Sequence, residues 1–191
     1  MLIGLTGCKG AGKDTAASFL EDYHVMKFAG PLKSAVAALF DLKSVDDVDA
    51  LKEYMAWIEI RHPLSSEAIN MSWRTFLQRF GTEMGRKTFG ADFWVDQWEI
   101  AYTQLSVLDP DAFRHVAVTD TRFVNEALRI KNSGGYIIEI RRPGHEPDGH
   151  ASEEPLPDDL VDATVLNDSD LETLRSRVIA TVEGLKVGIV S

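Results

Sequence analysis

The sequence predicts an α/β protein in which a parallel sheet of about five strands lies between two layers of helices. Five short apolar segments are the predicted strands: 2–6, 24–28, 115–119, 136–140 and 161–166. Their apolar residues do not alternate with polar ones, which is typical of strands covered on both faces. The segments alternate with stretches of helical period, and that order indicates parallel strands joined by helices. The 191 residues suffice for one domain with a substantial buried core.

Helix signals separate the first three strands. A helix is expected at 13–21, directly after a glycine-rich turn, and another begins at Gly30, with Pro31 in its first turn. Further helices are expected near 48–58, over 72–89 and over 92–108. The long connection between the second and third strands therefore consists mainly of helices.

The remaining helices flank the last two strands. A helix over 122–132 is stopped by Ser133-Gly134-Gly135. The pattern Ser169-Asp170-Leu171-Glu172 is a capping box that predicts the start of the final helix. The apolar stripe of that helix consists of Leu171, Leu174, Val178, Val182 and Leu185. Residues 143–157, rich in Pro, Gly and His, are expected to form a mobile loop.

Composition and charge exclude several classes of protein. No apolar run approaches the roughly 18 residues of a membrane span, and the first residues lack the basic region of a signal peptide. The single cysteine, Cys8, excludes a disulfide scaffold and a cysteine-based zinc site, so the cytoplasm is the expected location. The formal net charge of −10 disfavours a general nucleic-acid binder.

The acidic charge is concentrated near the C-terminus. Residues 144–172 contain ten Asp and Glu and no Lys or Arg, which leaves 20 acids and 20 bases in the rest of the chain. We interpret the acidic stretch as a solvated surface. An anionic ligand is therefore expected to bind in the remainder of the chain, where basic side chains converge.

One motif points to phosphate binding. Residues 7–15, Gly-Cys-Lys-Gly-Ala-Gly-Lys-Asp-Thr, complete the pattern G-x-x-x-x-G-K between a predicted strand and a predicted helix. Glycines let the backbone wrap round a phosphate with its N–H groups pointing inward, and Lys13 adds a charge for the β- and γ-phosphates. Gly10, Ala11 and Gly12 are the expected amide cradle. The alternative is a glycine-rich turn that binds nothing.

Two acids are candidates for orienting Mg²⁺. The residue after the lysine of such a loop is normally Ser or Thr, whose hydroxyl touches the ion, but here it is Asp14. A carboxylate can hold Mg²⁺ directly or through water. Thr15 is then expected to donate to a phosphate oxygen. Asp120 ends the apolar strand 115–119, as a second metal-orienting acid requires.

The helix over 72–89 has a second polar face of interest. At about 100° per residue, Arg74, Gln78, Gly81 and Gly85 fall within one arc of roughly 60°. One interpretation is that a flat ligand lies there, with Arg74 on its phosphate and Gln78 on its edge. The other is that the glycines permit close helix packing and Arg74 is a surface residue. The four tryptophans are assigned mainly to the core.

Several segments together resemble a known family. They are Gly10 to Thr15, Phe28 to Lys33, Trp73-Arg74 with Leu77-Gln78 and Gly81 to Glu83, Asp120 to Arg122, Arg142 to Gly144, His150 with Ser152-Glu153, Leu156-Pro157, and Asn167-Asp168 with Leu171-Glu172. In this order they resemble the phage deoxynucleoside monophosphate kinases, over about residues 2–180. The stretch 41–71 is unlike that family.

The resemblance implies a three-layer α/β/α P-loop kinase fold in a single domain over 1–191, with an acceptor-binding helical insertion at about 31–108 and a lid at about 141–157. The implied reaction is ATP-dependent conversion of a deoxynucleoside monophosphate to its diphosphate, with Mg²⁺, for phage DNA precursors in the host cytoplasm. Other P-loop kinases, acting on dephospho-coenzyme A or phosphomevalonate, and a non-catalytic nucleotide-binding switch are the alternatives. A homodimer is compatible with the sequence, which does not determine the oligomeric state.

The resemblance also implies roles for residues. Lys13 and the loop amides would hold the ATP phosphates, and Asn167 would lie near adenine. Lys33, Arg74 and Arg122 would meet the acceptor phosphate, beside Gln78. Arg141 or Arg142 would close from the lid onto the transferring phosphoryl group. No catalytic base is nominated, because a phosphate acceptor with a second pKa near about 6 is already a competent nucleophile at neutral pH.

Overall fold

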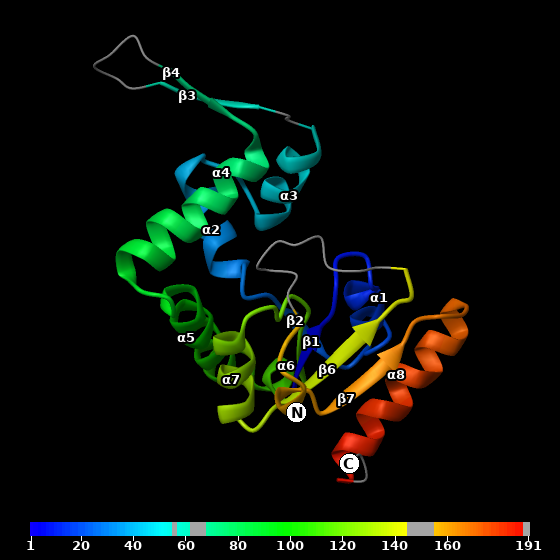
Figure 1. The fold of residues 1–191 in the computed structure, drawn as a ribbon. Helices are drawn as coiled ribbons and strands as arrows, with labels where there is room; N and C mark the ends of the chain where they lie inside the picture. The colour runs from blue at the N-terminus through cyan, green and yellow to red at the C-terminus, as the bar shows by residue number, and fades with distance from the viewer. Residues whose placement is uncertain (55–56, 62–67, 145–154, 189–191) are drawn as a thin grey trace. The chain divides into compact units, whose positions relative to one another are not determined.

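The computed structural model describes residues 1–54, 57–61, 68–144 and 155–188. The chain divides into two compact units, of which the first joins Met1–Phe28 to Glu99–Ser191 and the second is Ala29–Trp98. Figure 1 shows the elements of both, and each unit is described by itself.

The first unit is built on a five-stranded sheet. Its strands are β1 (Leu2–Thr6), β2 (His24–Met26), β5 (Val116–Val118), β6 (Tyr136–Arg141) and β7 (Ala163–Leu166). The order is β2-β5-β1-β6-β7 and every neighbouring pair is parallel, which confirms the predicted sheet. All the strands therefore end at the same edge, with β1 in the centre (Figure 1).

Helices cover both faces of this sheet. On one face, α1 (Lys13–Ser18) and α8 (Leu171–Lys186) bury a core with Ile3 and Leu5 of β1. Leu174, Val178, Val182 and Leu185 of α8 are buried as the predicted stripe requires, whereas Leu171 is exposed. On the other face lies α7 (Val124–Asn132), whose Ile130 packs over Gly4. The arrangement confirms a three-layer α/β/α fold.

Shorter elements complete the first unit. They are α6 (Pro110–Phe113), the 3₁₀ turn η3 (Asp158–Leu160) and the end of α5 (Phe93–Leu108). Arg129 of α7 forms an ion pair with Glu99 of α5, and this pair links the two helices on one side of the sheet. The sheet is therefore held between layers that leave its carboxyl edge to loops.

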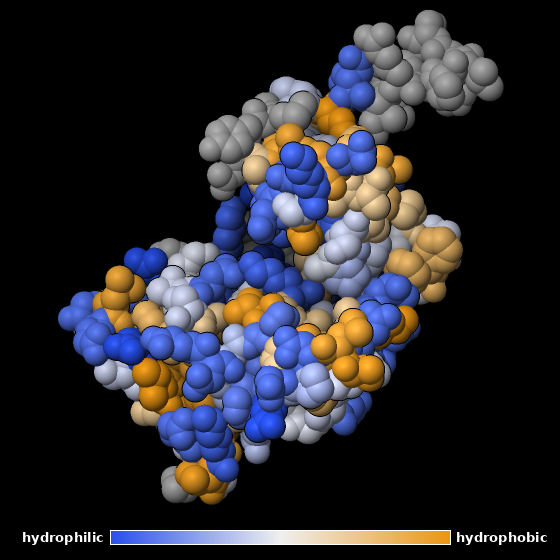
Figure 2. Space-filling view, turned by 180° about the vertical axis from the view of Figure 1, so that it is seen from behind, coloured by the Kyte–Doolittle hydropathy of each residue, from blue (hydrophilic) through white to orange (hydrophobic). Residues whose placement is uncertain are grey.

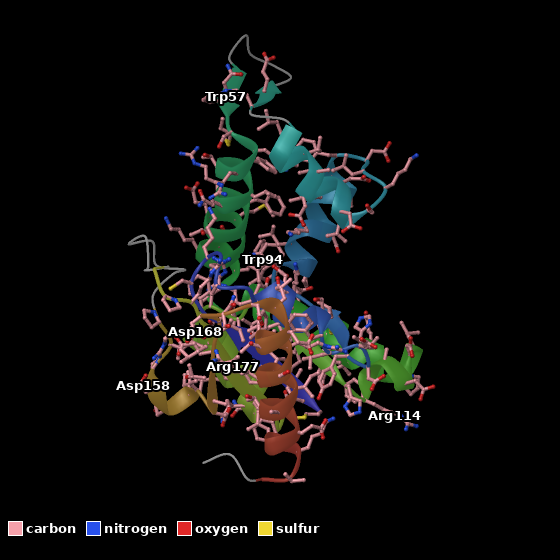
Figure 3. All side chains as sticks on the ribbon, turned by 90° about the vertical axis from the view of Figure 1, so that its right-hand side faces the viewer. Trp57, Trp94, Arg114, Asp158, Asp168 and Arg177 are labelled. Carbon is pink, nitrogen blue, oxygen red and sulfur yellow. The ribbon has the colours of Figure 1, made fainter. Side chains whose placement is uncertain are left out.

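The second unit is mainly helical. It contains α2 (Gly30–Leu39), α3 (Val45–Tyr54), the antiparallel hairpin β3 (Ile58–Arg61) and β4 (Ala68–Met71), α4 (Trp73–Arg79), the π-helix η1 (Phe80–Lys87) and the start of α5. Val36, Val48 and Phe76 belong to its core, and Trp73 donates from Nε1 to the Val48 carbonyl oxygen at 3.0 Å. Trp73, Trp94 and Trp98 are buried, as the sequence predicted for most tryptophans. Trp57 is the exception and is 67 % exposed (Figure 3).

Two helix predictions in this unit are confirmed only in part. A helix was expected near 48–58, but α3 ends at Tyr54, and Ile58 belongs to a strand that pairs with β4. A continuous α-helix was expected over 72–89, but residues 80–87 form a π-helix. Both differences depend on pairing and packing partners that local helix signals do not contain.

Other features bear on the predicted class. Among the residues that the structure describes, no helix combines the length and apolar character needed to cross a membrane. On the face shown in Figure 2, hydrophobic residues lie in small groups among hydrophilic ones.

Of the predicted lid at about 141–157, residues 145–154 lie outside the described part of the chain.

Candidate phosphate-binding site

The glycine-rich loop connects β1 to α1 and is closed by backbone contacts. Gly7 has a φ of +128°, and a Cβ atom there would lie 2.2 Å from the carbonyl oxygen of Ile140 in the neighbouring strand. Only glycine lets the chain leave β1 so close to β6. Ala11 donates its N–H to the Cys8 carbonyl oxygen at 3.1 Å, and Gly12, with φ +102°, precedes the first turn of α1.

Lys13 turns back onto the loop that precedes it. Its side chain is buried, and Nζ donates to the carbonyl oxygens of Gly7 at 2.5 Å and Cys8 at 2.9 Å. A buried ammonium needs such partners, because an unpaired charge is expensive to remove from water. The strand, loop and helix thus hold the lysine against the loop, and its role toward phosphate stays a prediction.

Asp14 connects the loop to two neighbouring strand ends. Its Oδ1 accepts a hydrogen bond from the Thr119 hydroxyl at 3.1 Å and forms an ion pair with Lys27 Nζ at 3.0 Å. Partial desolvation acts to raise the pKa of the Asp14 carboxyl, but the hydrogen bond and charge of Lys27, the Thr119 hydroxyl and the charge of Lys13 outweigh it, and the pKa is lowered. The carboxylate therefore stays ionised and available to a cation at neutral pH.

Asp120 follows directly on the same strand end. Its Oδ1 accepts the backbone N–H of Phe28 at 2.7 Å, which ties the end of β5 to the segment after β2. Its neighbour Thr119 is buried and donates to Asp14. The structure thus places the two candidate metal-orienting acids on adjoining segments of the carboxyl edge, Asp14 after β1 and Asp120 after β5.

Arg122 stands at the start of α7. Its N–H and that of Phe123 donate to Glu126 Oε2 at 2.8 Å and 3.1 Å, and Glu126 is buried. These bonds satisfy N–H groups that the first turn of a helix leaves unpaired, so they fix the backbone that carries the Arg122 side chain.

A hollow beside the loop contains two of the predicted arginines. Its lining consists of Thr6, Gly7, Cys8, Arg122, Glu139, Arg141, Pro155, Leu156, Asp158 and Val161. In it, Arg141 donates from Nη2 to Glu139 Oε2 at 2.6 Å, and the same oxygen accepts the Thr164 hydroxyl at 3.3 Å. Glu139 is largely buried, so the carboxylate is a fixed anchor for Arg141.

Arg142 and Asn167 contact the loop itself. Arg142 donates from Nη1 to the Gly10 carbonyl oxygen at 3.3 Å, and Asn167 donates from Nδ2 to the Ala11 carbonyl oxygen at 2.8 Å. The backbone N–H of Asn167 also donates to the Arg141 carbonyl oxygen at 2.8 Å. The two arginines that the sequence left as alternatives therefore have different partners. Near Asn167, the start of α8 is held by the Asp168–Arg177 ion pair (Figure 3).

Three predicted acceptor residues belong to the second unit. Lys33 Nζ binds both carboxylate oxygens of Asp49, at 2.7 Å and 2.6 Å. Arg74 and Gln78 are exposed on α4, whose first turn is capped by the Ser72 hydroxyl at 3.1 Å from the Thr75 nitrogen. These facts leave their assignment to the acceptor a prediction.

The two glycines of the π-helix η1, Gly81 and Gly85, are close-packing residues. A Cβ atom at Gly85 would lie 2.1 Å from Trp94 Nε1, and one at Gly81 would lie 2.7 Å from Leu32 Cδ1. Trp94 also donates from Nε1 to the Gly81 carbonyl oxygen at 2.8 Å. Since side chains of the same unit occupy this space, the packing interpretation explains both glycines, and the open platform for a flat ligand does not.

The sequence reasoning missed two residues of the site, Lys27 and Glu139. Lys27 lies inside the predicted strand 24–28, whereas β2 ends at Met26, so a search for charged residues after predicted strands did not include it. Glu139 lies inside β6, and its charge in an otherwise apolar strand was the available signal.

These features together define a P-loop nucleotide-binding protein of the α/β kinase type. The sequence model of the family "deoxynucleotide monophosphate kinase" matches residues 40–178. A putative deoxynucleotide monophosphate kinase of Acanthamoeba polyphaga mimivirus is 33 % identical over 96 % of both chains. The deoxynucleotide monophosphate kinase of Escherichia phage RB69 is 25 % identical over 93 % of this chain and 97 % of its own. The chain therefore belongs to the deoxynucleotide monophosphate kinase family.

One solved structure supports the fold alone. The dephospho-CoA kinase from Campylobacter jejuni superposes with a TM-score of 0.53 over 98 % of both chains, at 11 % sequence identity. Identity this low supports the shared architecture and says nothing about the acceptor.

Proposed function

We propose that this protein transfers the γ-phosphoryl group of ATP to a deoxynucleoside monophosphate and releases ADP and the diphosphate. The observation that supports this most strongly is the phosphate loop on the central strand of the sheet, with Lys13 held against it. Its carbonyl contacts preorganise the ammonium, so little rearrangement is needed when a phosphate chain arrives. In this proposal Gly10, Ala11 and Gly12 supply amides to the ATP phosphates and Thr15 donates its hydroxyl.

The residues at the carboxyl edge suit Mg²⁺. The Asp14 side chain is 77 % exposed and ionised, and Asp120 stands on the adjoining strand end. Within the described part of the chain, no three or more His, Cys, Asp and Glu gather into a group able to hold a metal ion. That donor set fits an ion that keeps several waters and uses one or two carboxylates together with substrate phosphates. Bound there, Mg²⁺ would neutralise phosphate charge.

Acceptor binding would use basic groups at defined positions. Arg122 is fixed by the capped start of α7 and lines the hollow beside the loop. Lys33, Arg74 and Gln78 of the second unit are our candidates for the remaining contacts with the monophosphate. No general base is required, since the acceptor phosphate is itself an ionised nucleophile at neutral pH. Phosphoryl transfer then depends on positioning and on charge neutralisation.

The two arginines at the end of β6 would act on opposite parts of the reaction. Arg141 shares the hollow with Arg122, so we assign it to the transferring phosphoryl group. Arg142 contacts the Gly10 carbonyl oxygen, and we assign it to the ATP side together with Asn167. Closure of the proposed lid over about 141–157 would exclude water and suppress ATP hydrolysis.

A panel of acceptors tests the proposal. Each deoxy- and ribonucleoside monophosphate, dephospho-coenzyme A and phosphomevalonate is incubated with the enzyme and Mg²⁺-ATP, and ADP release is followed. We expect turnover with one or more deoxynucleoside monophosphates. Turnover with only one of the other acceptors would show that this compound, and not a deoxynucleoside monophosphate, is the substrate. Tight ATP binding without any turnover would indicate a nucleotide-binding switch.

A further inference from the structure

Lys27 brings a cation to the loop from a separate strand. It follows β2, and its Nζ lies 3.0 Å from Oδ1 of Asp14, the residue after the loop lysine. The same carboxylate oxygen accepts the Thr119 hydroxyl at 3.1 Å. The ends of the adjacent strands β2 and β5 thus meet the first turn of α1 at one carboxylate.

The backbone that carries Lys27 is firmly held. Thr119 donates its N–H to the Met26 carbonyl oxygen at 3.3 Å, and Phe28 donates its N–H to Asp120 at 2.7 Å. The Phe28 residue is 3 % exposed. Since the residues on both sides are fixed, only the lysine side chain is left to move.

The ion pair contributes little to folding. The Lys27 side chain is 41 % exposed and that of Asp14 is 77 % exposed. Pairs as exposed as this are weakly stabilising, because water and salt screen the attraction. This ion pair therefore gives no structural reason for a lysine at this position.

The position of Asp14 indicates what else the ammonium can reach. The side chain after the loop lysine lies where Mg²⁺ meets the β- and γ-phosphates. The Lys27 ammonium lies 3.0 Å from the Asp14 carboxylate, and Lys13 directly precedes Asp14 in the first turn of α1. A lysine stem is flexible, and a rotamer change carries its charge from a carboxylate oxygen to an adjacent phosphate oxygen.

We propose that Lys27 is a phosphate-binding residue whose ammonium binds the γ-phosphoryl group of ATP, and that Asp14 positions it. The assignment rests on the proposed function, which supplies ATP as the donor. Lys13 neutralises the phosphate chain from the loop, and Lys27 adds a second charge at the terminal phosphate.

The test compares ATP with ADP in the absence of metal. Dissociation constants for both nucleotides are measured by calorimetry in EDTA for the wild type, Lys27→Met and Lys27→Arg. We expect Lys27→Met to weaken ATP binding about ten- to a hundredfold, as for a lost charge-assisted hydrogen bond, and to change ADP binding by less than about twofold. Lys27→Arg keeps the charge and should recover most of the ATP affinity.

Lys186→Met is the matched control. Lys186 forms a similarly exposed ion pair with Glu183, with Nζ 2.7 Å from Oε1, near the end of α8 and outside the loop. Both methionine variants should melt within a few degrees of the wild type, and Lys186→Met should bind both nucleotides normally. A structural role alone would lower the melting temperature of Lys27→Met without separating ATP from ADP.

Three results would overturn the assignment of Lys27: unchanged ATP binding in Lys27→Met, an equal loss for ATP and ADP, or a defect confined to the KM of the monophosphate. The proposed function fails separately, if the wild-type enzyme binds ATP and phosphorylates no deoxynucleoside monophosphate. In that case the ATP and ADP comparison in EDTA still decides whether Lys27 binds the terminal phosphate.

Discussion

Replacing Gly85 by alanine distinguishes the two interpretations of the glycines in the segment 72–89. Alanine is favoured over glycine inside a helix by about 1 kcal/mol, so helix propensity alone predicts that Gly85→Ala and Gly81→Ala both stabilise the protein. The packing around the two positions predicts a large difference between them. At Gly85 the new Cβ would lie 2.1 Å from Nε1, 2.6 Å from Cε2 and 2.9 Å from Cζ2 of Trp94.

The expected size of the effect follows from what Trp94 would lose. The indole is buried and donates to the Gly81 carbonyl oxygen at 2.8 Å, so displacing it leaves a buried N–H group unpaired, at a cost of about 1–3 kcal/mol. Overpacking a well-filled core costs about 1–3 kcal/mol more. When the gain in helix propensity is subtracted from the sum of these two costs, Gly85→Ala should destabilise the protein by roughly 3 kcal/mol.

Gly81→Ala is the control on the same helix. Its Cβ would meet only Cδ1 of Leu32, at 2.7 Å, which is the end of a flexible side chain. A small rotation of Leu32 relieves the contact, so the free energy of unfolding should change by less than about 1 kcal/mol.

Urea denaturation followed by circular dichroism measures both variants, and steady-state kinetics gives the KM of each substrate. The packing argument is refuted if Gly85→Ala unfolds like the wild type. A stable Gly85→Ala with a raised KM for the monophosphate would restore the interpretation of this face as a platform for the nucleotide.

Four further substitutions test the proposed site. Lys13→Met should abolish phosphoryl transfer while the protein stays folded, since the loop keeps its amides and loses its charge; activity and circular dichroism are measured together. Asp14→Ala and Asp120→Ala should each raise the Mg²⁺ concentration needed for half-maximal turnover, because each removes one carboxylate oxygen donor, as a magnesium titration would show. Arg74→Lys keeps the charge but loses the two parallel donors of guanidinium, so the KM of the monophosphate should rise and kcat/KM fall about tenfold or more, for a loss of roughly 1.5–3 kcal/mol, with the KM of ATP unchanged.

Contrary results for Lys13→Met, Asp14→Ala and Arg74→Lys would refute the corresponding assignments. Near-normal turnover by Lys13→Met would refute the phosphate-loop assignment. An unchanged magnesium titration of Asp14→Ala would make Asp14 an ordinary acid of the first helical turn, where the helix dipole favours it. If Arg74→Lys raises the KM of ATP alone, Arg74 belongs to the ATP site. If neither KM changes, Arg74 is a surface residue without a role in binding.

The loop was predictable because its signal is contiguous. Gly7, Gly12 and Lys13 act within one turn of chain, and the spacing of the glycines already implies backbone that wraps round a phosphate. The five strands were predictable for a similar reason, since a short run of apolar residues between helices is read locally. Asp120 was found from its place after such a strand, and its contact with Phe28 is consistent with a position at the carboxyl edge.

Pairing across the chain was not predictable in this way. No local pattern separates Arg141 from Arg142, which are neighbours in the sequence and yet contact Glu139 and Gly10 respectively. Gly85 packs against Trp94, which lies in the following helix. A helical wheel of residues 72–89 does not include Trp94, so it indicated an open face at a position that this side chain occupies. The wheel also assumed an α-helix where residues 80–87 are π-helical.

The sequence by itself determined where the charged groups and motifs lie relative to the predicted strands. A phosphate loop follows the first strand, an acid follows the third and an arginine pair follows the fourth. The tertiary structure decided which of those groups meet, such as Lys27 with Asp14 and Glu139 with Arg141. The physical reason is the distance along the chain over which each effect acts. Backbone propensity and hydrophobic period act over a few residues. An ion pair between strand ends forms only when the strands have paired in their final order and the helices have packed against the sheet.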